Sequence, residues 1–356
     1  MIYNLPVVVV DLTNLLFFTS PIGLGHATRD IAIAKKLIRS DAQISFVSGE
    51  AAHRLISLHG YDVVNAYHPK GFFIDCGKLR RPLIWLLRYL SYYRDCKRIS
   101  EDIVTSRQPD IIVSDEDLAS IQVAAKLNKK RILISDIIET HFTHGLLSLI
   151  EKKMNKSMRN IISKCDCVII PDFGTDEANI IHVGPIVREV DSDRNALRKR
   201  LGFDKKTIVV SVGGTDAGRQ LIDKSLEAFD KVRKRLDLDL VVVAGPLLTL
   251  PPQLSDNIRT KGFIDNLHEY IYAADVVISL AGRSTMDESI VYGTPGIFIP
   301  IKDHFEQECG AKRFGYRYQD IFRLETLIEE ALNLNRTACI NNDGALKAAK
   351  VILEFS

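Results

Sequence analysis

The chain has 356 residues, of which 46% are hydrophobic and 26% are charged, and its formal net charge is +2 at pH 7. This length suits two domains, because a single hydrophobic core seldom grows beyond about 250–300 residues. The near-neutral charge argues against a dedicated nucleic-acid-binding protein, whose affinity depends on neutralising phosphates. The sequence contains no apolar run of about twenty residues, so it predicts no membrane-spanning helix.

The six cysteines form no CxxC pair, which predicts neither a zinc site nor a disulfide scaffold and fits a reducing cytoplasm. Residues 1–10 lack the basic start and the small-residue cleavage site of a signal peptide. We interpret them either as an extra edge strand or as an extension, and we expect the protein to be cytoplasmic.

The first half alternates short apolar runs with amphipathic segments. Strands are predicted at 14–19, 43–48, 62–66, 110–114, 131–134 and 166–170, and helices after the first strand, at 51–59 and at 118–127. Such alternation is typical of a parallel sheet with helices on both faces. Ligands bind beyond the carboxyl ends of the strands in such sheets.

A second series of the same kind follows a Gly-Pro hinge at residues 182–188. Its strands are predicted at 207–212, 239–245, 261–264, 274–280 and 296–299, with helices between them. The predicted fold class is therefore α/β, with two Rossmann-like, doubly wound parallel-sheet domains. We place them at residues 1–185 and 186–340, and we expect residues 341–356 to form a C-terminal helix that can pack back on the first domain.

The first predicted strand leads into Gly23-Leu-Gly-His26 at the start of a helix. A dinucleotide-binding motif would need a third glycine where Thr28 stands, and a P-loop would need Gly-Lys-Ser/Thr. The remaining functional interpretation is a loop whose backbone approaches a substrate and which presents His26 at the helix N-terminus. The alternative is a histidine with a purely structural role.

Residues 279–300 contain a second strand, glycine turn and helix. Ser284 and Thr285 are predicted to offer N-cap hydroxyls to the helix that follows Gly282. A helix N-terminus after such a turn is a ready anion site. Glu288, one turn further on, can accept the two hydroxyls of a ribose. An ordinary strand–helix–strand unit is the alternative.

Several titratable residues follow predicted strand ends: Asp115, Glu116, Asp117, Asp136, Glu139, His141 and His144. Asp115 or Glu116 could act as a general base. A solvated helix start is a second interpretation of 115–117, and a metal-binding Asp-x-Asp is a weaker third. His141 and His144 could bind a metal only on a helix with a third ligand.

The segment from Pro82 to Tyr93 crowds apolar and aromatic residues and is flanked by arginines. This composition is typical of a helix that lies in a membrane interface. A buried helix between strands, with basic ends, is an equally good interpretation.

The second half resembles the donor half of MurG-type glycosyltransferases. The motifs that carry the resemblance run in order: 184–188, Gly213-Gly-Thr215, Gly262-Phe-Ile-Asp-Asn-Leu, Ala281-Gly-Arg-Ser-Thr-Met-Asp-Glu288, Gly293-Thr-Pro and Glu306-Gln307. Gly23-Leu-Gly-His26 is similar to the glycine-rich loop at the start of that family. Two positions depart from it: of a His-Glu-Gln-Asn motif only Glu139 is kept, and Thr215 replaces a serine.

The resemblance implies a GT-B-fold enzyme that transfers a hexose, N-acetylglucosamine, from a UDP-sugar to a lipid-linked acceptor by an inverting displacement. It implies roles for individual residues: Phe263 and Ile264 for uracil, Glu288 for ribose, Arg188, Gly213, Gly214, Thr215, Gly282, Ser284 and Thr285 for the diphosphate, Glu306 and Gln307 for the sugar, and Gly23 and Gly25 for the acceptor. His26, Asp115, Glu116 and Glu139 are the candidates for the general base, with His26 favoured. It implies no metal and no cofactor.

The implied partners are the UDP-sugar and a polyprenyl-phosphate-linked acceptor, with contact to the inner face of the membrane through Pro82 to Tyr93 and no nucleic acid. Two other functions share the expected fold. A UDP-sugar 2-epimerase would carry a Glu-Arg-Pro-Glu motif, where this chain has Pro300-Ile-Lys-Asp-His-Phe-Glu-Gln. A non-catalytic nucleotide-sugar-binding subunit would lack the cleft residues. A dehydrogenase is the weakest alternative.

Overall fold

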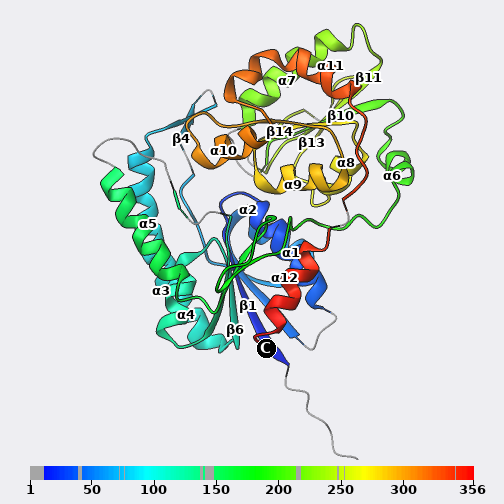
Figure 1. The fold of residues 1–356 in the computed structure, drawn as a ribbon. Helices are drawn as coiled ribbons and strands as arrows, with labels where there is room; N and C mark the ends of the chain where they lie inside the picture. The colour runs from blue at the N-terminus through cyan, green and yellow to red at the C-terminus, as the bar shows by residue number, and fades with distance from the viewer. Residues whose placement is uncertain are drawn as a thin grey trace, which may run out of the picture.

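The computed structural model describes residues 12–38, 42–71, 73–75, 77–136, 139–140, 148–213, 218–246, 248–251, 253–340 and 342–356. Two parallel sheets, each covered by helices, form two domains that face one another (Figure 1). This arrangement confirms the predicted α/β class. The possible edge strand at residues 1–10 lies outside the described part of the chain.

The first domain is built on a parallel sheet of order β3-β2-β1-β6-β7-β8-β9. Its strands are β1 (Thr13–Thr19), β2 (Ala42–Ser48), β3 (Asp62–Asn65), β6 (Ile111–Asp115), β7 (Lys130–Ile134), β8 (Cys167–Ile170) and β9 (Ile180–His182). The helices are α1 (Gly25–Leu37), α2 (Glu50–Leu58), α3 (Pro82–Arg107), α4 (Leu118–Lys126) and α5 (Ser148–Ile162). The centre of the sheet is fully buried because β1, β6 and β7 are apolar on both faces.

The second domain has a sheet of order β12-β13-β11-β10-β14-β15, in which β12 alone runs antiparallel to its neighbour. The strands are β10 (Lys206–Ser211), β11 (Leu238–Val243), β12 (Gln253–Ser255), β13 (Ile258–Lys261), β14 (Val276–Leu280) and β15 (Gly296–Ile299). The helices are α6 (Arg194–Leu201), α7 (Arg219–Val232), α8 (Leu267–Ala273), α9 (Arg283–Tyr292), α10 (Phe305–Arg313), the short η3 (Tyr318–Arg323) and α11 (Leu324–Asn333). The strand predicted at 261–264 was placed wrongly, because β13 ends at Lys261 and the following residues form a loop.

The chain crosses between the domains twice, at two neighbouring points. The Asn342 side-chain amide donates a hydrogen bond to the Pro185 carbonyl, at 2.7 Å, and so joins the two crossings. After the second crossing, α12 (Gly344–Leu353) packs against α1 of the first domain, where Ala348 and Ile352 are buried in the core (Figure 1). The C-terminal helix therefore completes the core of the first domain.

A hairpin of the first domain is paired with the second domain. It consists of β4 (Phe73–Asp75) and β5 (Lys78–Arg80), and β4 lies near α10 in Figure 1. The Leu79 N–H donates to the Lys302 carbonyl at 2.9 Å, and the Lys302 N–H donates to the Gly77 carbonyl at 2.8 Å. Gly77 has φ +67°, and a Cβ there would lie 2.1 Å from the Gln220 side-chain oxygen. Glycine is therefore the residue that suits the hairpin tip.

Helix α3 has two different faces. Tyr92 and Tyr93 pack against a buried cluster that includes Phe18 and Tyr67. At the start of the helix, Ile84, Leu87 and Leu90 are exposed, Leu87 by 68%. The segment from Pro82 to Tyr93 thus combines a core helix with an exposed apolar stripe. Within the described residues, no helix is long and apolar enough to span a bilayer.

Candidate active site

A pocket lies between the two domains, at the carboxyl ends of their central strands. The first domain lines it with residues 22–26 and 28–29, Asp136 and the hairpin residue Ile74. The second domain lines it with the start of α9, the loop after β13 and the start of α10. The pocket therefore occupies the position that open α/β sheets use for ligands.

The β1–α1 turn brings His26 to this pocket. Gly23 has φ +85°, a conformation that residues with side chains rarely adopt, and Gly25 opens the helix. A Cβ on Gly25 would lie 3.5 Å from the Ser284 Cβ, so this turn passes close to the second domain. The Thr28 and Ser284 hydroxyls are 2.9 Å apart and form a hydrogen bond between the domains.

His26 is held by a buried carboxylate. The Nδ1 atom of His26 lies 2.8 Å from Oδ1 of Asp115, the last residue of β6, and Asp115 is fully buried. An ionised carboxylate only accepts hydrogen bonds, so Nδ1 carries the proton and Nε2 is the basic nitrogen of the neutral ring. The His26 side chain is 20% exposed and lines the pocket. This arrangement is that of a general base oriented by a carboxylate.

Opposing effects set the protonation of this pair. Burial lowers the pKa of His26, but the Asp115 carboxylate outweighs burial and leaves that pKa raised. Burial raises the pKa of Asp115, but the Arg29 guanidinium and His26 hold it well below its usual range. Asp115 is therefore ionised at neutral pH and serves as the partner of His26 rather than as a base itself.

The other two candidate bases do not reach the pocket. Glu116 accepts hydrogen bonds from the Ser135 hydroxyl, at 2.8 Å, and from the Asp136 N–H, at 2.7 Å, while burial and Asp136 raise its pKa to about 7. Glu139 forms an ion pair with Arg159 at a partly exposed position. Among the described residues, neither glutamate lines the pocket. Glu116 and Glu139, two of the four candidates for the general base, therefore lie outside the pocket that His26 lines.

The β14–α9 turn of the second domain faces the β1–α1 turn. Helix α9 has Gly282 as its N-cap, so the prediction of Ser284 and Thr285 as N-caps was wrong, and both lie in the first turn. Within the described chain no side chain caps α9, which leaves its first N–H groups for a ligand. Gly213, with φ +72°, also lines the pocket, whereas Gly214 and Thr215 lie outside the described residues.

Arg188 and Glu288 bind each other at the pocket wall. The Arg188 Nε donates to Glu288 Oε1 at 3.0 Å, and its Nη1 donates to the Asp265 carbonyl at 2.6 Å. Both side chains are buried. Burial raises the pKa of Glu288, and Arg188 opposes that effect. Arg188, expected to bind the diphosphate, and Glu288, expected to bind the ribose, therefore form a buried ion pair in the pocket wall.

The other donor candidates divide into two groups. Ile264, Glu306 and Gln307 line the pocket, and Gln307 Oε1 accepts the Ile301 N–H at 3.0 Å. The Phe263 side chain instead packs on the core of the first domain, with the Arg54 guanidinium 5.0 Å from its ring centre. Its side chain therefore joins the domains, and uracil contacts from this position would have to come from its backbone.

Sequence reasoning placed Asp136 after a strand end but missed three charged pocket residues, Arg29, Arg283 and Asp287. Arg29 and Asp136 form an ion pair at 2.7 Å, and Arg283 binds Asp287 at 2.8 Å. Burial raises the pKa of Asp287 to about 7, although Arg283 opposes it. The spacings His26–Arg29 and Arg283–Asp287, three and four residues on one helix face, were the available signals. Ile74 and His304, also at the pocket, had no such signal.

Metal binding finds no support in the described part of the chain, where no three His, Cys, Asp or Glu side chains form a cluster suited to an ion. The possible ligands His141 and His144 lie outside the described residues. The absence of metal from the proposed chemistry therefore stays a prediction.

Comparison with known proteins identifies the second domain first. Residues 207–348 match the glycosyltransferase family 28 C-terminal domain. The chain is 24% identical over 266 residues to an uncharacterized glycosyltransferase of Methanopyrus kandleri, covering 68% of this chain and 74% of that protein. It is 24% identical over 305 residues to a Bacillus cereus UDP-N-acetylglucosamine--N-acetylmuramyl-(pentapeptide) pyrophosphoryl-undecaprenol N-acetylglucosamine transferase, covering 82% and 78% of the two chains.

Solved structures share the fold over nearly the whole chain. The glycotransferase of kitacinnamycin has a TM-score of 0.68 at 13% identity, covering 96% of this chain and 99% of that one. MurG of Acinetobacter baumannii has a TM-score of 0.55 at 14% identity, with coverage of 96% and 99%. The protein is thus a glycosyltransferase with the GT-B fold that resembles MurG-type enzymes, and its residues 207–348 match the family 28 C-terminal domain.

Proposed function

We propose that the protein transfers a hexose, N-acetylglucosamine, from a UDP-sugar to a lipid-linked acceptor, with inversion and without a metal ion. One observation carries the proposal: His26, fixed by Asp115, lines the pocket opposite the uncapped start of α9. A base and an anion site therefore face each other across one cleft. The name of the Bacillus cereus relative, an N-acetylglucosamine transferase acting on a pyrophosphoryl-undecaprenol substrate, supports this choice of donor and acceptor.

In the proposed reaction, an acceptor hydroxyl attacks the anomeric carbon of the donor. The Nε2 atom of His26 takes the hydroxyl proton. Without a base, the hydroxyl would release this proton to water only at a pH far above neutral. The bond from the anomeric carbon to the diphosphate oxygen breaks, and UDP leaves with the bonding electrons. The N–H groups at the start of α9, with the hydroxyls of Ser284 and Thr285, stabilise the negative charge of the departing diphosphate.

Residues of the pocket wall would provide the remaining contacts to the donor, which are those to uracil, ribose and the sugar. Ile264 lies after β13 and would pack on uracil, and Glu288, which pairs with the buried Arg188, would accept the ribose hydroxyls. Glu306 and Gln307, at the start of α10, would bind hydroxyls of the sugar. Each of these contacts is offered by the second domain.

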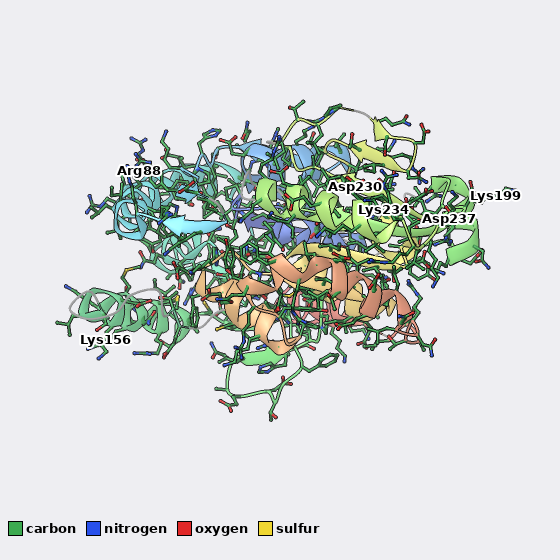
Figure 2. All side chains as sticks on the ribbon, turned by 90° about the horizontal axis from the view of Figure 1, so that it is seen from above. Arg88, Lys156, Lys199, Asp230, Lys234 and Asp237 are labelled. Carbon is green, nitrogen blue, oxygen red and sulfur yellow. The ribbon has the colours of Figure 1, made fainter. Side chains whose placement is uncertain are left out.

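The acceptor proposal depends on the surface formed by α3 and α5. The exposed stripe Ile84, Leu87 and Leu90 lies on α3, and α5 exposes Lys152, Lys153 and Lys156. Figure 2 shows Arg88 and Lys156 pointing outward at the same end of the molecule. Exposed apolar and basic side chains at one end of a molecule suit the interface of an anionic membrane. We therefore propose that this surface binds the inner face of the membrane that holds the acceptor.

The test is a screen of UDP-sugars for UDP release, with and without a polyprenyl-phosphate lipid extract. The proposal expects release from UDP-N-acetylglucosamine only when the lipid extract is present, together with a glycosylated lipid product. Conversion of the UDP-sugar to its 2-epimer without an acceptor would establish the epimerase instead. Release from no UDP-sugar, despite UDP binding, would favour a non-catalytic subunit.

A further inference from the structure

We propose that Arg29 is a positioning residue that limits the proton affinity of His26, by sharing the Asp115 carboxylate with the imidazole. The inference rests on the proposed role of His26 as the base. It explains how a histidine that faces a buried carboxylate can remain free to accept a proton at neutral pH.

The contacts of Arg29 define this role. Its Nε donates to Asp115 Oδ2 at 2.8 Å, and its Nη2 donates to Asp115 Oδ1 at 2.5 Å. Both carboxylate oxygens are thus engaged by one guanidinium, and Oδ1 also accepts from His26. Arg29 is 6% exposed, so water screens this interaction weakly. A planar fork of donors is the feature that fits arginine, and not lysine, to this carboxylate.

The distance from Arg29 to the imidazole gives the electrostatic reason. Arg29 Nη2 lies 3.3 Å from Nδ1 of His26. Protonated His26 would therefore carry a positive charge directly beside a buried guanidinium, and the two cations would have one carboxylate between them. The neutral imidazole avoids this repulsion. Arg29 thus opposes the increase in proton affinity that Asp115 alone would cause.

Other titratable and charged groups also surround His26. They are Glu116 after β6, Asp136 after β7, Asp30 on α1, and the Arg283–Asp287 pair on α9. Burial, with the neighbouring Asp115, raises the pKa of Asp30 well above its usual value. Asp136 is bound by Arg29 itself, at 2.7 Å. Removing Arg29 would therefore leave two carboxylates without their shared cation.

The consequence is a prediction about the His26–Asp115 pair as a unit. Without the guanidinium, the pair gains net negative charge and binds a proton more tightly, wherever that proton resides. The base would then be protonated over a wider pH range. We expect the acid limb of the rate profile to move to higher pH, by about 1–3 pH units for the loss of a buried charge at this distance.

The experiment measures kcat/KM against pH for the wild type, Arg29→Met and Arg29→Lys. We expect the acid limb of kcat/KM to move to higher pH by the whole shift in Arg29→Met. In Arg29→Lys, which keeps the positive charge but not the planar fork of donors, we expect a smaller shift. UDP affinity should stay unchanged in both variants. Lys36→Met is the matched control, because Lys36 is a cation on the same helix that pairs with Glu189 at the surface, and it should leave the limb in place.

A merely structural role would lower the rate equally at every pH and leave the limb unmoved, and that result would overturn the proposal. Should Arg29→Met fail to fold, the His26 imidazole can be titrated by NMR in wild type and Arg29→Lys. An unchanged midpoint there would overturn it equally. Failure of the underlying function is distinguishable, because His26→Asn would then retain turnover whatever the Arg29 variants do.

Discussion

The β1–α1 and β14–α9 turns have the same construction, a buried parallel strand, a glycine and a helix that starts at the pocket. Their side chains differ in kind. The first turn presents titratable and charged groups, His26 and Arg29, backed by the buried Asp115. The second presents the hydroxyls of Ser284 and Thr285 and uncapped N–H groups. The comparison suggests that one turn moves a proton and the other holds an anion.

This division of roles has a physical reason. A base needs its proton affinity tuned, and in a buried site that requires nearby charges of both signs. An anion site needs donors that are already oriented, and a helix N-terminus supplies them without a counter-charge that would bind the leaving group too tightly. The four predictions that follow either break or sharpen this comparison, and they run from the largest expected effect to the smallest.

Replacing His26 by Ala should abolish proton transfer at the β1–α1 turn and leave the anion site of the β14–α9 turn intact. Loss of a general base lowers kcat by about 10²–10⁴-fold. A UDP-release assay with the UDP-sugar and lipid acceptor measures this. His26→Asn is the informative control, because its amide can still donate to Asp115 but cannot take a proton, and it should be as inactive as the alanine variant. Full activity in either variant would remove His26 from the reaction.

Replacing Glu288 by Ala should weaken donor binding by the second domain. Arg188 would be left buried without its carboxylate, which costs about 3–5 kcal/mol of stability. UDP affinity should fall by about tenfold or more through loss of a charged hydrogen bond to ribose. Thermal unfolding and calorimetric UDP titration measure the two effects.

The double variant Arg188→Met with Glu288→Ala separates stability from binding. Removal of both charges should restore much of the stability, since no unpaired buried charge remains. UDP affinity should stay low. If the double variant bound UDP as the wild type does, the ribose role of Glu288 would be refuted.

Replacing Leu87 by Glu tests the exposed apolar stripe of α3, which we propose binds the membrane on the side of the first domain. An apolar side chain that enters an interface contributes about 1.5–3 kcal/mol, so vesicle binding should weaken by about tenfold or more. Flotation with vesicles of an anionic phospholipid measures this. Leu334→Glu is the matched control, because Leu334 is 64% exposed and lies just after α11 in the second domain. Equal losses in both variants would contradict a membrane role for α3.

Replacing Lys302 by Pro tests the hairpin contact between the two halves. Proline removes the N–H that donates to Gly77, at a cost of about 0.5–1.5 kcal/mol. The hairpin carries Ile74 to the pocket, so we expect the donor KM to rise by about 2–10-fold. Lys302→Ala keeps the N–H and should leave the KM unchanged. A similar rise in both variants would assign the effect to the lysine side chain.

Much of the fold could be predicted from the sequence, because apolar runs and glycine turns are local signals. The strands that flank Gly23 and Gly282 lie where periodicity placed them, and both turns reach one pocket. The N-cap of α9 was harder, since a run of Gly282, Ser284 and Thr285 offers several residues that favour this position. The structure selects Gly282.

The contents of the pocket were less predictable, because they depend on pairs distant in sequence. Arg188 and Glu288 are 100 residues apart, and each had a plausible separate role before their contact was known. Phe263 could not be placed on the first domain without the arrangement of the two domains. Glu116 and Glu139 follow strand ends, but side-chain direction at those positions depends on neighbouring strands.

The most direct test of the division between the two turns is a calorimetric titration of UDP into His26→Ala. The account predicts the dissociation constant of the wild type, because the anion site belongs to α9 and its neighbours in the second domain. A dissociation constant raised as far as in Glu288→Ala would show that the β1–α1 turn holds the donor, and would contradict the account.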